Sequence, residues 1–405
     1  MSAPAAKRNL GTFELRISPL WARLLLAGLI AIQILPVLLL TRPAAYSATY
    51  WLVNYQDGFV RRGFAGSVLR AVTGGDPSYA QISAAMAVMW IVPLIAVAVL
   101  LELLVRAGSR EAVLTALLVA SSPFLVHQLV YQQRPDQLGI VVLIATAVGL
   151  VRAGRPLLVA AGGGLAFAAV AFVHEGIFFY YVPFAMIVAA VTISDRREQI
   201  RASGLLFVPP ALATAFIGAF GHVSQEQVDA FSRSAPAEVA GSPDIGHFRE
   251  YMGDTIPTAL HHVYDEVGGN AKIIATTGLF TVILVALTWC WLVRWSRVNS
   301  IDLARRLRPP VRTATLGFLV ASIVVTLAIG ADWARWLCIF GTGWLISSAA
   351  LALCQDRPPR SDDGVVSIPV PAIVLAVAFA LLPPIPEQFN RDAVVTWLTF
   401  GVYSR

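Results

Sequence analysis

Runs of apolar residues recur along most of the chain and alternate with short polar segments. Most of these runs come close to the roughly 20 helical residues that cross a bilayer core about 30 Å thick. A spanning β-barrel would instead show short segments of alternating polarity. The pattern therefore predicts an all-α fold class, in the form of a polytopic transmembrane helical bundle.

Eleven crossings are predicted. They cover residues 20–40, 82–105, 111–130, 137–151, 156–173, 177–193, 202–221, 273–293, 313–330, 336–354 and 366–383. Residues 156–193 are divided at HEG, residues 174–176, because one uninterrupted helix over this stretch would be about 57 Å long. The alternative is an even number of crossings, if the weak run 137–151 does not cross or the stretch AVVTWLTFGVY at 393–403 inserts.

The positive charges orient this bundle. Of the 30 Lys and Arg residues, 19 fall in segments on the same side as the amino terminus. The positive-inside rule then places the amino terminus in the cytoplasm and the carboxyl terminus outside. Residues 1–405 are predicted to form a single integral membrane domain, multi-pass, in a bacterial inner membrane. Two outer loops are long: 41–81, expected to carry interfacial helices, and 222–272, expected to form short helices with a capping box at SQEQ.

Composition narrows the class of function. The chain is 57% hydrophobic and 13% charged, and its net charge of +6 is explained by topology, so nucleic acid is not expected as a partner. The three cysteines, Cys290, Cys338 and Cys354, lie in apolar runs and indicate neither disulfides nor a metal cluster. HHVYDE at 261–266 has His and acidic residues four apart, but no third ligand is evident. No cofactor is therefore predicted, and a divalent metal is the weaker alternative.

The segment NYQDGFVRRGFAGS, residues 54–67, follows the first predicted crossing. It predicts a turn and then a short helix whose glycines allow close approach to a ligand. Arg61 and Arg62 are candidate phosphate ligands, because forked guanidinium donors suit phosphate oxygens. Asp57 is a candidate catalytic base for a sugar hydroxyl, or a helical ion-pair partner of Arg61. The alternative is an interfacial helix with these apolar residues in lipid: Phe59, Val60, Phe64 and Val68.

Three further clusters of ionisable residues fall on the outer side of the predicted bundle. They are Arg134 with Asp136, His174 with Glu175, and Asp332 with Arg335. Ionisable groups at the hydrocarbon boundary are costly unless paired or solvated, which makes them candidates for a functional site. Glu175 is a second candidate catalytic acid or base, and the other five are candidate substrate-binding residues. The alternative for each cluster is an interfacial ion pair or a solvated turn. Four clusters on one side predict a shared polar cavity.

This layout resembles the GT-C superfamily of membrane glycosyltransferases. The resemblance rests on a cytoplasmic amino terminus, many crossings, and a large first outer loop with an acidic residue, Asp57. The chain is similar, more loosely, to bacterial polysaccharide polymerases of the O-antigen polymerase type. The resemblance implies transfer of a sugar from a polyprenyl-phosphate or polyprenyl-diphosphate donor to a lipid or glycan acceptor at the outer face. The paired acidic residues common in the GT-C loop are absent here, so only Asp57 carries over.

Other function classes stay open. A nucleotide-sugar enzyme needs a binding domain inside, whereas the predicted inside segments are short and basic. A transporter or flippase for lipid-linked oligosaccharides is the main alternative. Transporters place ionisable residues near the membrane midplane, whereas here they are predicted at outer helix ends. A third alternative is an acyltransferase or a structural assembly factor in envelope synthesis.

Overall fold

The computed structural model describes residues 13–40, 45–125, 129, 134–152, 154–242, 244–253, 256–296, 309, 311–329, 333–354 and 365–382. The first half contains β1 (Glu14–Ile17), α1 (Pro19–Leu40), α2 (Ala45–Thr49), α3 (Gly63–Thr73), α4 (Tyr79–Ala107), α5 (Arg110–Ser121), the 3-10 turn η1 (Pro135–Gln137), α7 (Leu138–Arg152), α8 (Pro156–Ala171) and α9 (Ile177–Thr192). The second half contains α10 (Arg196–Phe220), α11 (Gln225–Arg233), α12 (Ala237–Ala240), α13 (Asp244–Met252), α14 (Ile256–Arg294), α16 (Val311–Ile329), α17 (Trp333–Leu353), β2 (Val366–Pro369) and α18 (Val370–Ala380).

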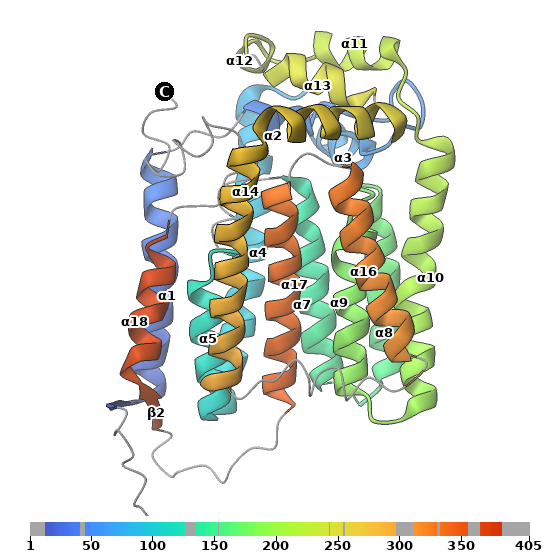
Figure 1. Ribbon diagram of the computed structural model, residues 1–405. Coiled ribbons are helices and arrows are strands. Elements are labelled where there is room, and N and C mark those ends of the chain that lie inside the picture. The colour runs from blue at the N-terminus through green and yellow to red at the C-terminus, as the bar shows by residue number, and fades with distance from the viewer. Residues whose placement is uncertain are drawn as a thin grey trace, which may run out of the picture.

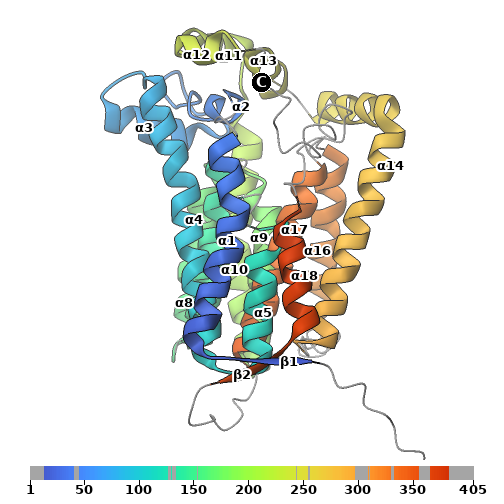
Figure 2. The same ribbon diagram turned by 90° about the vertical axis from the view of Figure 1, so that its left-hand side faces the viewer.

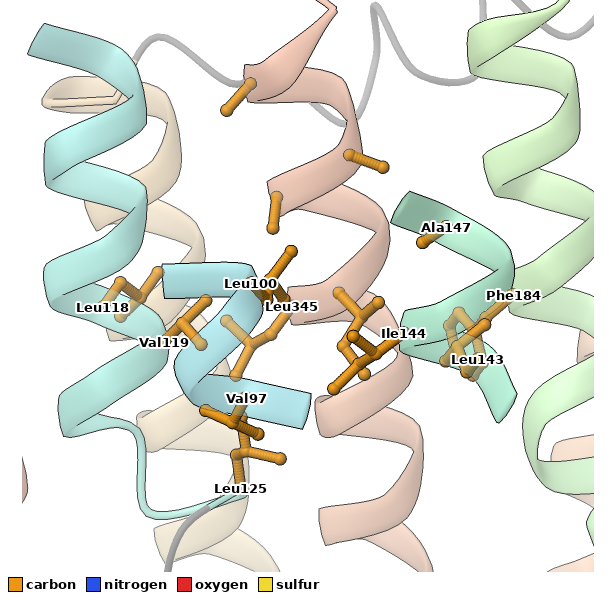
Figure 3. Packing of buried hydrophobic residues seen from close by; sticks show 14 of the residues in the cluster. Val97, Leu100, Leu118, Val119, Leu125, Leu143, Ile144, Ala147, Phe184 and Leu345 are labelled. Carbon is orange, nitrogen blue, oxygen red and sulfur yellow. The ribbon is translucent and has the colours of Figure 1, made fainter. Parts of the chain in front are cut away.

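The long helices stand side by side as one bundle (Figure 1). Its core is built from leucine, isoleucine, valine and phenylalanine side chains of α4, α5, α7, α9 and α17, as Figure 3 shows for Val97, Leu118, Ile144, Phe184 and Leu345. Close packing of such residues from five helices fixes the positions of the helix ends. Those ends carry the polar residues considered below.

Several helices are suited to a membrane by length and composition. Five are long and apolar enough to cross one: Tyr79–Ala107, Pro135–Arg152, Arg196–Phe220, Val311–Ala328 and Arg335–Leu353. Five shorter apolar helices cover Pro19–Leu35, Pro156–Ala171, Ile177–Thr192, Thr281–Arg294 and Val370–Ala380. On α16, hydroxyl residues such as Thr315 and Ser322 are fully buried, whereas Val320 and Val324 are each 60% exposed. Apolar side chains facing outward are expected where the surrounding solvent is lipid. The chain is an all-α membrane protein.

The predicted helices at 20–40, 82–105, 137–151 and 156–193 agree with the structure within a few residues, and α8 and α9 are separate helices as predicted. Four predictions were wrong in extent. Residues 366–369, at the start of the crossing expected over 366–383, form the strand β2, and α18 begins only at Val370. α5 ends at Ser121 rather than 130, because Ser122 adopts an extended conformation. α10 begins at Arg196, where the Asp195 carboxylate caps the helix. Residues 256–272, expected to form short helices, belong to the long α14. The stretch 393–403 lies outside the described residues.

One end of the bundle carries a cap formed by the two long loops. Figures 1 and 2 show α2, α3, α11, α12 and α13 gathered there. The cap has a hydrophobic core of its own, in which Trp51, Leu52 and Val60 of the first loop pack with Phe231 and Phe248 of the second. Val60 is fully buried, which contradicts the alternative that it enters lipid; Phe64 and Val68 are exposed. The predicted capping box forms at the start of α11, between Ser224 and Gln227.

A two-stranded antiparallel sheet lies at the opposite end (Figure 2). β1 pairs with β2 in the register Glu14↔Pro369 to Ile17↔Val366. Glu14 forms an ion pair of 2.9 Å with Arg110 and accepts a hydrogen bond of 2.6 Å from Ser367. The sheet connects the chain before α1 to the chain before α18. The sequence did not predict this sheet, because strands of four residues are too short to show a reliable alternation of polarity.

Close packing of α8 on α10 generates a prediction about the GGG segment. A Cβ at Gly164 would clash with the backbone oxygen of Leu205, whereas a Cβ at Gly162 would have no neighbour within 4 Å. Gly164→Ala should lower stability by about 1–3 kcal/mol, the usual cost of overpacking. Gly162→Ala is the matched control and should change little or stabilise the helix. The thermal midpoints of the purified proteins in detergent measure both effects, and equal midpoints would contradict the packing role.

Candidate functional site

A turn in the first loop positions Arg62. The Asn54 side chain accepts a hydrogen bond of 2.9 Å from the backbone N–H of Gln56, and Gly58 adopts a positive φ of 113°. Arg62 then adopts the left-handed conformation, with φ 63° and ψ 10°, immediately before α3. It is the only non-glycine residue with positive φ among those that the structure describes. Such a conformation costs roughly 1–2 kcal/mol, so the surrounding contacts must hold it.

The strained backbone directs Arg62 toward the turn between α8 and α9. Its Nη2 donates to Oε1 of Glu175 at 2.7 Å, and its Nε lies 3.1 Å from both carboxylate oxygens. The two side chains are 21% and 25% exposed, so this ion pair is sheltered but within reach of a ligand. Burial raises the pKa of Glu175, but the neighbouring side chains, chiefly Arg62, together outweigh burial and hold the pKa below its usual range. Glu175 is therefore a carboxylate at neutral pH.

A second ion pair joins Asp136 and Arg335. Asp136 lies in η1, which Pro135 opens, and Arg335 lies in the first turn of α17. The Arg335 Nη2 donates to Oδ2 of Asp136, and the side chains are only 2% and 5% exposed. Buried charges of this kind persist only when paired in good geometry. The pair therefore fixes the start of α7 against the start of α17.

Tyr50 lies between Arg62 of the first ion pair and Arg134, which is two residues from Asp136 of the second. The Arg134 guanidinium carbon lies 5.2 Å from the centroid of the Tyr50 ring, and that of Arg62 lies 6.0 Å from it. Both distances suit cation–π attraction. Arg134 is 1% exposed. Two cations from distant parts of the sequence therefore share one aromatic ring.

His174 lies between the two ion pairs and is neutral. Its Nδ1 accepts a hydrogen bond of 3.0 Å from the Gly176 N–H, which leaves the proton of the neutral ring on Nε2. Burial and the nearby Arg62 lower the pKa of His174 to about 3. Its ring lies 5.8 Å from that of Tyr180, which in turn lies 5.1 Å from Trp336.

We call eight residues the polar cluster: Tyr50, Arg62, Arg134, Asp136, His174, Glu175, Tyr180 and Arg335. Six of them were predicted site residues. The structure brings together two of the four predicted outer clusters in full and one residue from each of the other two, Arg62 and Arg335. The cluster lies where the bundle meets the cap, at the start of α7, α9 and α17. Tyr50 and Tyr180 were missed, since single aromatic residues beside or inside apolar runs give no spacing signal.

The remaining predicted residues lie elsewhere. Arg61 is half-buried in the cap, where its Nη2 donates to the Met252 carbonyl at 2.7 Å. The Asp57 side chain is exposed, and its backbone carbonyl accepts a hydrogen bond of 3.0 Å from Gln227. The expected helical pairing of Asp57 with Arg61 was wrong in its premise, because the helix begins only at Gly63. Asp332 lies outside the described residues.

The suggested metal spacing in the second loop has limited support. The His261 Nε2 lies 3.4 Å from the Asp265 Oδ2, and both side chains are largely exposed. Within the described ranges, no group of three or more His, Cys, Asp or Glu residues is placed to hold a metal ion. No step of the chemistry considered below is assigned to a metal.

The lowered pKa of His174 predicts a pH dependence of stability. Between its pKa of about 3 in the folded protein and about 6.5 in the unfolded chain, the unfolded chain binds the extra proton. The free energy of unfolding should therefore fall as the pH is lowered from about 6.5, by up to about 1.4 kcal/mol per pH unit. His174→Asn keeps an acceptor for the Gly176 N–H and should flatten this slope. Thermal midpoints measured in detergent across this range provide the test.

The control for this prediction is His222→Asn, which replaces an exposed histidine. It should leave the slope unchanged. A slope that survives in His174→Asn would show that other groups cause it.

Comparison with known proteins gives a family but no activity. The model of a family described as "Uncharacterised membrane protein Rv1490" matches residues 20–238. This span is more than half of the chain and includes every member of the polar cluster except Arg335. The names of the similar proteins state no activity either, so glycosyl transfer stays a prediction.

Two relatives are the "Uncharacterized protein Rv1490" of Mycobacterium tuberculosis (strain ATCC 25618 / H37Rv) and the "Uncharacterized protein Mb1527" of Mycobacterium bovis. Each is 35% identical over 136 residues, which cover 32% of this chain and 30% of the relative. The chain thus spans less than a third of the curated relatives it matches. No solved structure matches it. Because the family model covers more than half of its residues, the chain belongs to the Rv1490 family of membrane proteins.

Proposed function

We propose that this protein is a membrane glycosyltransferase that transfers a sugar from a polyprenyl-phosphate or polyprenyl-diphosphate donor at the outer face of a bacterial inner membrane. The polar cluster at the capped end of the bundle is the observation that carries this proposal. It combines three guanidinium groups with two carboxylates beside apolar, membrane-suited helices. A lipid-linked donor has the same division, with a phosphate head and an apolar chain.

The arginines suit the phosphate. The polar cluster has a net charge of +1, because His174 is neutral and three guanidinium groups face two carboxylates. The guanidinium groups belong to Arg62, Arg134 and Arg335. Forked guanidinium donors bind phosphate oxygens through paired hydrogen bonds. The same groups would stabilise the lipid phosphate as it leaves the anomeric carbon. Such a donor is already activated, so the proposed reaction needs no cofactor.

Glu175 is the proposed catalytic base. It would take the proton of the acceptor hydroxyl as the hydroxyl oxygen bonds to the anomeric carbon and the bond from that carbon to the phosphate oxygen breaks. The acceptor is a lipid or a glycan. Asp57 is the weaker candidate, since its side chain is exposed and lies apart from the polar cluster.

The proposal includes a topology. The eleven predicted crossings correspond to α1, α4, α5, α7, α8, α9, α10, α14, α16, α17 and α18, with the amino terminus in the cytoplasm and the carboxyl terminus outside. Arg106, Arg110 and Arg155 lie at helix ends opposite the cap, as the positive-inside rule requires of the cytoplasmic side. The cap and the polar cluster then face outward.

A second candidate is a lipid-linked oligosaccharide polymerase, which uses the same phosphate chemistry on a longer donor. A transporter or flippase of the same pathway is less favoured, because the polar cluster lies at helix ends rather than in broken helices near the midplane. Formation of the glycan product in isolated membranes would distinguish an enzyme from a transporter.

The Arg62 pair generates a first functional prediction. In a strain lacking the gene, Arg62→Ala should fail to restore the lipid-linked glycan that the wild-type gene restores, and Arg62 with Arg61 replaced together should fail equally. The reason is loss of the phosphate ligand nearest the base. Mass spectrometry of extracted lipid-linked glycans measures the outcome.

The matched control is Arg70→Ala, which removes an arginine paired with Asp76 on the more exposed part of the same loop. It should restore the glycan normally. If Arg62→Ala restores it as well, with the protein present in the membrane, the arginine has no role in the reaction.

The two candidate bases give a second prediction. Glu175→Gln keeps the shape of the side chain but removes the base, and should lower turnover by roughly 100-fold or more. Asp57→Asn should keep turnover within about twofold of wild type. The rate of glycan formation in isolated membranes decides between them. The opposite ranking would transfer the role to Asp57.

A further inference from the structure

A row of aromatic side chains leads away from the polar cluster. The Tyr55 and Phe59 ring centroids are 5.4 Å apart, Phe59 lies 5.2 Å from Phe216, and Phe216 lies 4.9 Å from Phe220. Phe172, at the end of α8, lies 6.1 Å from Phe59. We call these five residues the aromatic row. The row is accessible, since Phe216 is 47% and Phe220 is 63% exposed.

The upper end of the row lies against the first loop. The Arg61 backbone N–H donates to the Gly221 carbonyl at 3.0 Å, and Gly221 directly follows Phe220. Phe59 precedes Arg61 by two residues, and Phe172 precedes His174 by two. The upper end of the row therefore adjoins the backbone of the first loop, in the segment that carries Arg61 and Arg62.

The lower end of the row continues along α10. Leu212 lies four residues before Phe216 in the sequence, and Val208 lies four residues before Leu212. Their side chains are 66% and 50% exposed. Residues four apart share a helix face, so an apolar stripe runs from the capped end of α10 toward the middle of the helix. The stripe has the direction that a lipid chain takes when its head lies at the membrane surface.

Tyr55 adds a polar group at the head of the row. Its hydroxyl is buried and has no hydrogen-bond partner among the described residues. Burial raises the pKa of Tyr55 to about 12, so the hydroxyl is a neutral donor. A buried donor without a partner is unfavourable, and an oxygen atom of a ligand head group would satisfy it.

We propose that the aromatic row binds the isoprenoid chain of a polyprenyl phosphate, with its phosphate at Arg62 of the polar cluster. This inference rests on the proposed function and names the part of the donor that the row holds. Isoprene units are branched and unsaturated, so they lose less conformational freedom than a saturated acyl chain when held against flat rings. Guanidinium groups at one end and exposed apolar side chains at the other match a phosphate joined to a long hydrocarbon.

Binding to the purified full-length protein in detergent tests the inference. The probes are a long-chain polyprenyl monophosphate, phosphatidic acid and inorganic phosphate, each measured by native mass spectrometry. The wild type should retain the polyprenyl phosphate in preference to phosphatidic acid. Phe216→Ala with Phe220→Ala should weaken polyprenyl phosphate binding about tenfold, which corresponds to about 1.4 kcal/mol, and leave inorganic phosphate binding unchanged.

The matched control is Trp21→Leu, which removes an aromatic side chain that is 63% exposed at the opposite end of the bundle. It should bind the polyprenyl phosphate as the wild type does. A photoreactive group on the isoprenoid chain gives a second measurement on the unmodified protein, and should label the peptide that contains residues 208–220.

Three results would overturn the inference: unchanged binding by the double variant with no label in residues 208–220, equal retention of phosphatidic acid and polyprenyl phosphate, or an equal loss in Trp21→Leu. Equal retention would identify a surface for ordinary bilayer lipids.

The inference and the proposed function can be contradicted independently of each other. If the lipid binds as described but membranes form no glycan, the transferase proposal fails and the site stands. If Arg62 is needed for product formation but the aromatic row is not needed for lipid binding, only the proposed isoprenoid site is ruled out.

Discussion

The buried ion pair between Asp136 and Arg335 constrains the capped end of the bundle. Removing either charge from water costs several kcal/mol unless the partner lies in good geometry, and both side chains are almost inaccessible. The pair therefore fixes the height of α7 relative to α17, since sliding one helix along the other would leave two buried charges apart. Arg134 and His174 are also buried beside it. The polar cluster depends on these helix ends being held in place.

The apolar bundle makes such precise placement feasible. The hydroxyl groups of α16 face inward and its valines outward, so the surface suits lipid while polar atoms stay inside. Against this rigid scaffold the first loop can hold Arg62 in a left-handed conformation. Backbone strain of this kind persists where surrounding structure enforces it and is concentrated at functional sites. Here the enforcing contacts include the Glu175 carboxylate and the Tyr50 ring.

Much of this could be read from the sequence, for identifiable reasons. Long apolar runs predicted most helices because the thickness of the bilayer core sets the number of apolar residues that a crossing helix needs. The convergence of Arg62, Asp136, Glu175 and Arg335 followed from placing each charged turn on one side of the membrane. Their partners did not follow, because pairing is decided by side-chain directions that one-dimensional spacing does not contain. The three-residue spacing allowed a pair between Arg335 and Asp332, but it gave no sign of Asp136, which pairs with Arg335 from 199 residues away. The helix start at Gly63, which separates Asp57 from the cluster, also depends on tertiary contacts.

In the proposed reaction, the Arg62–Glu175 pair would link the basicity of Glu175 to the binding of the donor. Two forces oppose each other at Glu175: burial, which favours the neutral acid, and Arg62, which favours the carboxylate. In a polyprenyl-diphosphate donor the two phosphate groups carry two negative charges, so they compete for the guanidinium more strongly than a carboxylate with one. When the donor phosphate draws Arg62 away, burial becomes the stronger influence, and the pKa of Glu175 must rise. A carboxylate that is a poor base in the empty site then becomes a better one when the donor is bound. In the proposed reaction, the same interaction would stabilise the resting protein and make the basicity of Glu175 depend on the donor.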